Sequence, residues 1–491
     1  ADFPMRRCPT CQGIDYGKGC PKCAKQPQEE EEPLQRTFGE GDGRHSESES
    51  ASEARANRRV RAFSAEDEFI VPSTYRGPIL PAPSANERWV DVLSDASFQR
   101  IEKLKFGPDF SSEGSHRTVT WLNENQFAIA KNFRVFRVTV PSGATEEMFR
   151  TPAWRERSIS DMAALDDGAI VVCGERFWAH VWRDGQQWAK GHDSPFACNP
   201  DWDRVSVSKS GQLVRTGLTT HEVSKSWIFG FSGFGENTNY KGHEFFLFEN
   251  PHERTPKSSF VLDWGYGELR TGTTEITWSP SERFLGLHDL SGSAPVVLDL
   301  LDEKQKSPIS GRRMKPNEGF IHGIAWHPVR DILATSYHIW ADQSAGVQRF
   351  GFAILDAATG NQLFDQAVSR SDYSTCLDWC STGRRIAIGG NDHAVILWDL
   401  VTGSGQQLLG HRGKVKEVRF SPDGQRLASS SEDENWKRRT IIWGCHAPYP
   451  KLAEFDGSIH EYSKIRSSPW SSSGRRLLAS HRDGIRVMEL Q

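Results

Sequence analysis

Long apolar runs are missing from this sequence of 491 residues. No stretch approaches the roughly 18 consecutive apolar residues of a membrane-spanning helix, and segments such as Gly168–Gly174 (GAIVVCG) have the length of a single strand. The opening residues ADFPMRR are not followed by the apolar core of a secretory signal. We therefore expect a reducing, intracellular compartment and assign the protein to the cytoplasm, with the nucleus left open.

An excess of either charge is also missing. The chain has 60 Lys and Arg against 64 Asp and Glu, a formal net charge of −4, which disfavours a chain devoted wholly to nucleic acid. Methionine is scarce, with 5 residues, whereas the chain has 17 Trp, 27 Phe and 43 Gly. This composition favours a core of aromatic side chains and short apolar strands over a helical bundle.

Known catalytic motifs are absent. There is no HExxH, no Walker loop and no complete GxGxxG. The segment Gly230–Gly235 (GFSGFG) departs from the GxSxG elbow because Phe234 occupies the last glycine position. We assign no catalytic residue and predict that the protein is not an enzyme.

The nine cysteines fall into two groups. Cys173, Cys198, Cys376, Cys380 and Cys445 are scattered, and we expect buried thiols at these positions. The other four lie in CPTCQGIDYGKGCPKC, with the spacing C-x2-C-x8-C-x2-C. Four thiolates at tetrahedral corners suit Zn²⁺, and a segment this small needs metal binding for its folding energy. The pattern resembles short zinc-ribbon modules and predicts one structural Zn²⁺ in residues 1–25; a redox pair or two disulfides are the alternatives. The predicted ligands are Cys8, Cys11, Cys20 and Cys23.

Residues 26–95 are expected to form a linker. Gln26–Glu53 contains nine acidic and two basic residues and almost no apolar ones, so it cannot offset chain entropy by burial. A basic cluster at 55–61 follows, and residues 62–95 carry four prolines that disfavour helices and central strands. We interpret this stretch as a tether, with a partner-binding arm as the alternative.

The rest of the chain, residues 96–491, is repetitive. The clearest units are Tyr373–Gly410, Lys414–Gly457 and Tyr462–Leu490. Each begins with a short alternating strand, continues through a turn such as SPDG to a second strand with small residues, and ends on a third apolar strand. This pattern is typical of an all-β repeat protein.

On these residues the chain resembles the WD40 β-propeller family. The diagnostic segments are Gly410–His411, Ser421–Gly424, Trp398–Asp399 and Trp443. The resemblance implies an all-β propeller and, in the unit Lys414–Gly457, a hydrogen-bonded structural tetrad. Its members would be His411, Ser430 (or its neighbour Ser429), Asp433 and Trp443.

First strands are expected to start near residues 119, 159, 203, 274, 321, 373, 414 and 462, which predicts eight blades, with seven as the alternative. The last unit ends after three strands, and an open edge would invite pairing with other chains. Residues 98–106 (FQRIEKLKF) alternate suitably, so we predict that they close the ring.

Three segments are candidates for partner binding, because aromatic and Arg side chains are the usual anchors of protein interfaces. They are Trp227–Tyr240, Tyr337–Phe350 and Glu434–Arg439. Packing between neighbouring blades is the alternative for the first two segments, and a merely decorated loop for the third. We predict a non-enzymatic scaffold with a protein partner and no membrane or small-molecule substrate. The alternatives are a nucleic-acid-associated factor using the ribbon and the 55–61 cluster, and a propeller enzyme with a central-channel site. The candidate residues are Trp227, Phe231, Phe234, Tyr240, Trp340, Arg349, Trp436, Arg438 and Arg439.

Overall fold

The computed structural model divides the chain into two units, Ala1–Phe63 and Ser64–Gln491. In the first unit, β1 (Arg6–Arg7) pairs antiparallel with β2 (Ile14–Asp15). The four cysteines of the predicted zinc site lie outside the described residues. The described residues are 6–7, 14–15, 76–77, 80–94, 97, 101, 117–131, 134–150, 159–174, 177–181, 187–191, 204–227, 234–249, 257–263, 275–288, 296–301, 320–342, 347–369, 374–459, 468–481 and 484–491.

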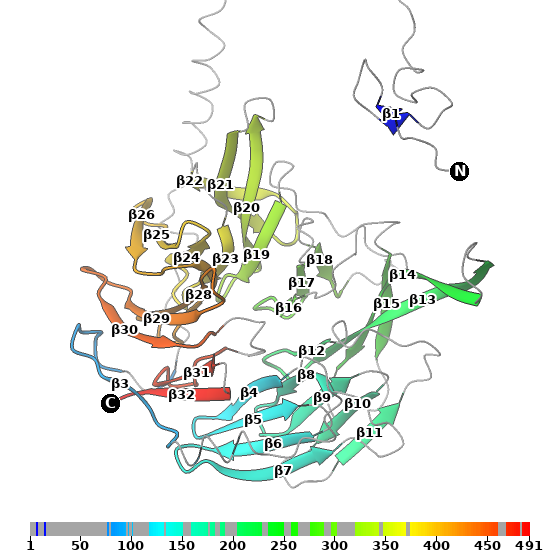
Figure 1. The fold of residues 1–491 in the computed structure, drawn as a ribbon, viewed down its shortest axis with the longest axis horizontal. Coiled ribbons are helices and arrows are strands. Elements are labelled where there is room, and N and C mark those ends of the chain that lie inside the picture. Colours follow the sequence, from blue (N-terminus) through cyan, green and yellow to red (C-terminus); the bar gives the residue numbers. More distant parts are fainter. Residues whose placement is uncertain are drawn as a thin grey trace, which may run out of the picture. The chain divides into compact units, whose positions relative to one another are not determined.

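Within its described residues, the second unit consists of successive antiparallel sheets, six with four strands and two with three (Figure 1). No helix in the described part of the chain is long and apolar enough to cross a membrane. The four-stranded sheets are β4–β7 (Arg117–Asn123, Gln126–Lys131, Arg134–Thr139 and Ala144–Arg150), β8–β11 (Ile159–Ala164, Ile170–Gly174, Phe177–Val181 and Gln187–Gly191), β12–β15 (Arg204–Val207, Leu213–Trp227, Phe234–Phe248 and Ser258–Asp263), β19–β22 (Phe320–Trp326, Ile332–Asp342, Val347–Asp356 and Gln362–Ser369), β23–β26 (Ser374–Trp379, Arg385–Gly390, Ala394–Asp399 and Ser404–Leu409) and β27–β30 (Lys414–Phe420, Arg426–Glu432, Arg438–Gly444 and Lys451–Asp456). The three-stranded sheets are β16–β18 (Glu275–Trp278, Phe284–His288 and Val296–Asp299) and β3–β32–β31 (Trp89–Asp91, Gly484–Leu490 and Arg476–His481).

The all-β propeller fold is confirmed, but the blade count is wrong. Within the described residues, six sheets have the four strands of a complete blade, rather than eight or seven. Seven of the predicted first strands do begin within two residues of a strand start, and the start near 462 lies outside the described residues. The other two sheets have three described strands each, and residues 302–319 and 460–467, which adjoin them in sequence, lie outside the described residues.

Apolar side chains from neighbouring sheets form the core. Val395 and Leu397 of β25 pack in one buried cluster with Val418 of β27 and Ile441 of β29. Side chains of a strand alternate between the two faces of its sheet. One face packs on the preceding sheet and the other on the following sheet. The clusters therefore continue from sheet to sheet along the chain.

The first and last sheets are neighbours as well. Val119 and Phe127 of the first sheet share a buried cluster with Leu478, Ile485 and Val487 of the last. The indole of Trp121 donates to the carbonyl of Pro469 at 2.9 Å. The succession of sheets is therefore closed into a ring.

The closing strand is β3, upstream of the predicted one. Trp89 pairs with Leu490 and Asp91 with Met488, so β3 covers the edge of β32 (Figure 1). Ile101 is the one described residue within 98–106, and its backbone is helical. The predictions of closure by 98–106 and of a linker reaching residue 95 are therefore wrong. Proline content concealed this part of the propeller, and its pairing partner lies at the other end of the sequence.

Acidic side chains join the turns of adjacent sheets at one end of the ring. Glu282, in the turn between β16 and β17, accepts hydrogen bonds from Ser208 Oγ at 2.8 Å and from the Ser210 amide at 2.7 Å. Asp331, in the turn between β19 and β20, accepts from Ser281 Oγ at 2.6 Å and from its amide at 3.1 Å. We call these contacts seam bonds, because each crosses from one sheet to the next.

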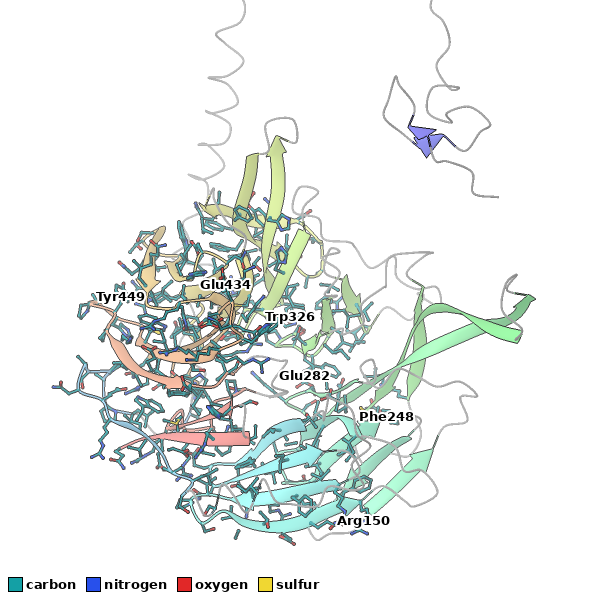
Figure 2. The ribbon with its side chains drawn as sticks, in the orientation of Figure 1. Arg150, Phe248, Glu282, Trp326, Glu434 and Tyr449 are labelled. Atoms are coloured by element: carbon teal, nitrogen blue, oxygen red, sulfur yellow. The ribbon has the colours of Figure 1, made fainter. Side chains whose placement is uncertain are left out.

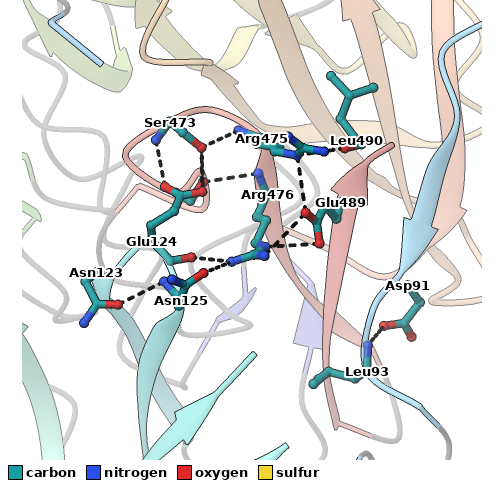
Figure 3. Close-up of polar contacts among 11 residues, drawn as sticks. Asp91, Leu93, Asn123, Glu124, Asn125, Ser473, Arg475, Arg476, Glu489 and Leu490 are labelled. Atoms are coloured by element: carbon teal, nitrogen blue, oxygen red, sulfur yellow. Dashed lines mark hydrogen bonds and ion pairs between the residues drawn. The ribbon is translucent and has the colours of Figure 1, made fainter. Parts of the chain in front are cut away.

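The closing seam uses the same type of bond (Figure 3). Glu124, between β4 and β5, accepts from the hydroxyls of Ser471 and Ser472 at 3.0 Å and from the amide of Ser473 at 3.0 Å. Arg476 of β31 donates to the carbonyl of Glu124 at 2.7 Å. The ends of the ring are thus joined by the same chemistry as its interior sheets.

A buried ion pair fixes the strap, as we call residues 80–94, to the ring. Arg426 of β28 is 0% exposed and Glu87 is 6% exposed. Arg426 Nε lies 3.1 Å from both carboxylate oxygens of Glu87, and Nη2 donates to the carbonyl of Pro81 at 2.8 Å. The indole of Trp89 donates to the same carboxylate at 3.1 Å. The strap is therefore positioned before its strand reaches β32.

Substituting Glu87→Leu is expected to lower the free energy of unfolding by about 3–5 kcal/mol, because Arg426 stays buried without its main counter-charge. Urea unfolding measures this change. The matched control is Glu146→Leu, since Glu146 pairs with Arg137 while 69% exposed and a surface pair contributes about 0–1 kcal/mol. Equal effects of the two substitutions would show that the strap is not fixed by this pair.

Candidate partner-binding surface

The best-described candidate surface lies at one end of the sheet β27–β30. Its centre is the turn 433–437 between β28 and β29, which includes Glu434 (Figure 2). A Cβ on Gly413 would lie 2.3 Å from the Glu432 carbonyl oxygen. The connection 410–413 from the preceding sheet therefore touches this turn. We call the exposed residues of the turn and the connection, with Leu409 before them, the Trp436 surface: Leu409, Arg412, Glu434, Asn435, Trp436 and Lys437.

Asp433 builds the turn. Its carboxylate accepts from the amides of Asn435 at 2.9 Å and Lys437 at 2.8 Å. The amide of Trp436 donates to the Asp433 carbonyl at 3.0 Å, and the Asp433 amide donates to the Lys437 carbonyl at 3.0 Å. Residues 434–436 form the loop of this hairpin. The last of these three residues has a left-handed backbone, which favours glycine.

Trp436 occupies that left-handed position with φ of 59° and is 77% exposed. A left-handed backbone costs a residue with a Cβ about 1–2 kcal/mol, and exposure to water gives no compensation from burial. Leu409 is likewise 68% exposed. The sequence therefore keeps Trp436 exposed at a cost to stability, and Leu409, at the end of β26 in the preceding sheet, is a second exposed apolar side chain.

Below the surface, His411 is held between two serines. Its Nε2 lies 2.6 Å from Ser429 Oγ and its Nδ1 lies 2.8 Å from Ser431 Oγ. The indole of Trp443 donates to Ser429 Oγ at 2.8 Å. Burial lowers the pKa of His411 to about 4, so the imidazole is neutral at pH 7. The network fixes the connection 410–413 and, through it, the Trp436 surface.

Two of the predicted tetrad residues lie outside this network. Ser430 points to the other side of β28, where its Oγ lies 2.9 Å from Thr440 Oγ1 and accepts from the Ile459 amide at 2.7 Å. Its neighbour Ser429, which the sequence analysis left open, is the hydroxyl between His411 and Trp443. Asp433 shapes its own turn, and no hydrogen bond to His411 is found among the described residues.

The two predicted arginines of this sheet are already paired. Arg438 Nε donates to Glu432 at 2.8 Å, and Arg439 Nη1 donates to Glu454 at 2.5 Å. The bond to Glu454 raises the pKa of Arg439 above its ordinary value. The exposed cations beside Trp436 are instead Arg412 and Lys437, which sequence reasoning did not select. In the sequence, the pair Gly410–His411 and the loop at Trp436 were the features that could have pointed to Arg412 and Lys437.

The remaining candidates lie on two long hairpins. Trp340 is opposite Gln348 on β20–β21, next to the pair of Ile339 and Arg349. Trp227 is opposite Phe234, and Tyr240 is opposite Thr220, on β13–β14. Phe231 lies outside the described residues. β12 pairs with β13 only as far as Thr216, and β15 pairs with β14 only from Gly242, so the end of this hairpin projects from its sheet (Figure 1). The structure does not bring these residues together with Trp436.

Acidification is expected to destabilise the propeller through His411. Its pKa is lowered from 6.5 to about 4 by burial, so the unfolded chain binds the proton more tightly, and stability falls as the pH drops from 6.5 toward 4. At pH 5 the loss from this group is about 2 kcal/mol. Urea unfolding at pH 7.5 and pH 5 should show a smaller loss for His411→Gln than for the wild type; equal losses would contradict this role.

Comparison with known proteins gives short matches to one family. Residues 369–399 and 403–437 match the family described as WD domain, G-beta repeat. The chain is similar to the WD repeat-containing protein SL1-17 of Schistosoma mansoni, 46% identical over 61 residues, or 12% of this chain and 20% of that protein. It is also similar to a guanine nucleotide-binding protein subunit beta of Nicotiana tabacum, 26% identical over 187 residues, or 38% of this chain and 48% of that protein. The matches thus span less than half the length of either relative.

A solved structure supports the fold over a longer range. The chain described as "Structure of Dos1 propeller" superposes with a TM-score of 0.50 at 11% identity, covering 77% of this chain and 93% of that one. At this identity the likeness concerns the fold alone. The chain therefore contains WD40 repeats within a β-propeller.

Proposed function

We propose that this chain is a non-enzymatic protein-interaction scaffold whose propeller presents the Trp436 surface to a partner. The observation that carries the proposal is an exposed tryptophan in a strained backbone conformation. Strain of this kind persists where the surrounding structure imposes it, and it is concentrated at functional sites. Tryptophan is also among the residues that contribute most to binding at protein interfaces.

The chemistry around Trp436 suits a protein partner. Leu409 provides a second apolar side chain, and Arg412 and Lys437 are exposed beside the turn. An apolar centre with charged residues at its edge is the usual composition of a protein interface. The charges favour a partner with acidic groups around an apolar contact.

The buried titratable groups support a structural role over catalysis. Burial raises the pKa of Asp378, and its carboxylate accepts from the Phe420 amide at 2.7 Å, which joins two sheets. His411, the buried histidine with a lowered pKa, bonds to serines of its own sheet. Both groups hold neighbouring strands together.

We further propose that the N-terminal unit is a zinc ribbon that makes an accessory contact. Support comes from the pairing of Arg7 with Ile14, which turns the chain back on itself around the first Cys-x2-Cys pair. Four thiolates would satisfy a closed tetrahedral site, so the metal would stabilise the fold of this unit without taking part in a reaction.

Trp436→Asn is expected to remove partner binding without loss of stability. Asparagine tolerates the left-handed conformation, so the free energy of unfolding should stay unchanged or rise. Affinity purification with quantitative mass spectrometry should show recovery of specific partners reduced by about tenfold or more. Leu301→Asn is the control, because Leu301 is also 69% exposed but lies outside the Trp436 surface. Undiminished recovery with Trp436→Asn, or an equal loss with the control, would argue against this surface.

The zinc proposal predicts about one equivalent of zinc per chain. Elemental analysis of the purified full-length protein should find that metal, and Cys8→Ser should lose it, whereas Cys173→Ser should retain it because Cys173 is buried in the propeller. A wild-type content below about half an equivalent would exclude a four-cysteine site.

A further inference from the structure

A groove opens at the end of the propeller opposite the Trp436 surface. Its volume is about 890 Å³. It lies between the strap and three connections, β23–β24, β27–β28 and β29–β30, all of which are at the opposite end of their sheets from the turn 433–437. The residues that line it from these connections include Thr382, Arg384, Arg385, Asp423 and His446, and the strap contributes 82–85.

The groove lies at a seam where no seam bond is found among the described residues. The turns 380–384 and 421–425 touch, since a Cβ on Gly424 would be 3.0 Å from Ser381 Oγ. At three other seams an acidic side chain accepts from a serine of the neighbouring turn. Here the buried Ser381 Oγ has no hydrogen-bond partner among the described residues. The acid of this seam, Asp423, bonds instead to Gln425 and Ser421 of its own turn.

Arg385, in the wall of this groove, has donors with no acceptor among the described residues. Its side chain is only 12% exposed, and its Nε lies 3.5 Å from Asp399 Oδ2. Its Nη1 makes a long contact of 3.4 Å with His446 Nε2. The Asp399 carboxylate already accepts hydrogen bonds from Arg384 Nε at 2.8 Å and from the Val401 amide at 3.0 Å. A guanidinium has five N–H donors, so most of those on Arg385 lack an acceptor in the described part of the chain.

The neighbouring charges favour a single negative charge in the groove. Burial, together with Arg385 and Arg384, lowers the pKa of His446, so its imidazole is neutral at pH 7. Arg384 and Arg385 then share the carboxylate of Asp399, which leaves one positive charge on this wall. Asp423 faces them from the other wall, 3.7 Å from Arg426, and would repel a second negative charge. A carboxylate therefore fits better than a phosphate dianion.

We propose that this groove binds an acidic segment of a partner protein, with an Asp or Glu side chain of that segment accepting hydrogen bonds from Arg385. The partner would supply, at this seam, the kind of acidic acceptor that the chain itself supplies at three other seams. The identification of the ligand as a protein rests on the proposed scaffold function. The need of Arg385 for an acceptor is independent of that function. Arginine and carboxylate form short, charge-assisted and often bidentate pairs.

The test uses short synthetic peptide mixtures with random flanks and a central residue fixed as Glu, Gln or phosphoserine. The full-length protein is expected to retain the Glu mixture about tenfold better than the Gln mixture, because a hydrogen bond to a charged group is lost. Arg385→Gln should abolish this preference, and Arg150→Gln, at an exposed arginine on β7 outside both surfaces, should keep it. Equal retention of Glu and Gln, a preference that survives Arg385→Gln, or stronger retention of phosphoserine would overturn the proposal.

A second variant separates binding from folding. Ala85 is exposed on the strap and lines the groove, so Ala85→Trp should obstruct it without changing a charge and should abolish the Glu preference. Retention of the preference by Ala85→Trp would contradict the assigned position. Trp436→Asn leaves the groove intact and should keep the Glu preference, so failure at the Trp436 surface and failure at this groove are distinguishable.

Discussion

Closure of the ring is the constraint on which the other features of the propeller depend. Each sheet is covered on both faces only if the last sheet meets the first, and an uncovered β32 would present an open hydrogen-bonding edge. The chain meets this need with the strap, through the pairing of β3 with β32 and the bond from the Val92 amide to the Val487 carbonyl at 2.9 Å. The buried pair of Arg426 and Glu87 fixes the strap before its strand begins.

The closed ring supports local features that are unfavourable by themselves. At one end, Trp436 has a left-handed backbone within a turn in which its amide donates to the Asp433 carbonyl. At the other end, Arg385 is largely buried, and most of its donors have no acceptor among the described residues. A structure tolerates such departures when the rest of its contacts fix the fold, and they are expected at functional sites. The two proposed binding surfaces are therefore consequences of one rigid framework.

Much of the fold could be predicted because its signals are local. Alternating strands and turns such as SPDG placed seven first strands within two residues. The spacing of His411 and Trp443 identified their sheet, but the hydroxyl between them depended on strand register, and adjacent serines on a strand face opposite ways. His411 contacts Ser429 and Ser431, which share a face.

The features that the sequence did not predict depend on residues distant in the chain. Arg426 and Glu87 are 339 positions apart, and the prolines of the strap disguised its strand. Arg438 and Arg439 looked available, but their partners lie across or along the sheet, at Glu432 and Glu454. The groove is formed by turns from two sheets and the strap, so no single segment carries a pattern for it.

Native-state hydrogen exchange on the full-length protein tests the role of closure most directly. If closure is part of one cooperative ring, the amide of Val92 and the amides of β32 should exchange with the same opening free energy as those of the central strand β28. Exchange of Val92 and β32 at a much lower opening free energy, while β28 stays protected, would show that the propeller is stable without its closing strand and would contradict the account.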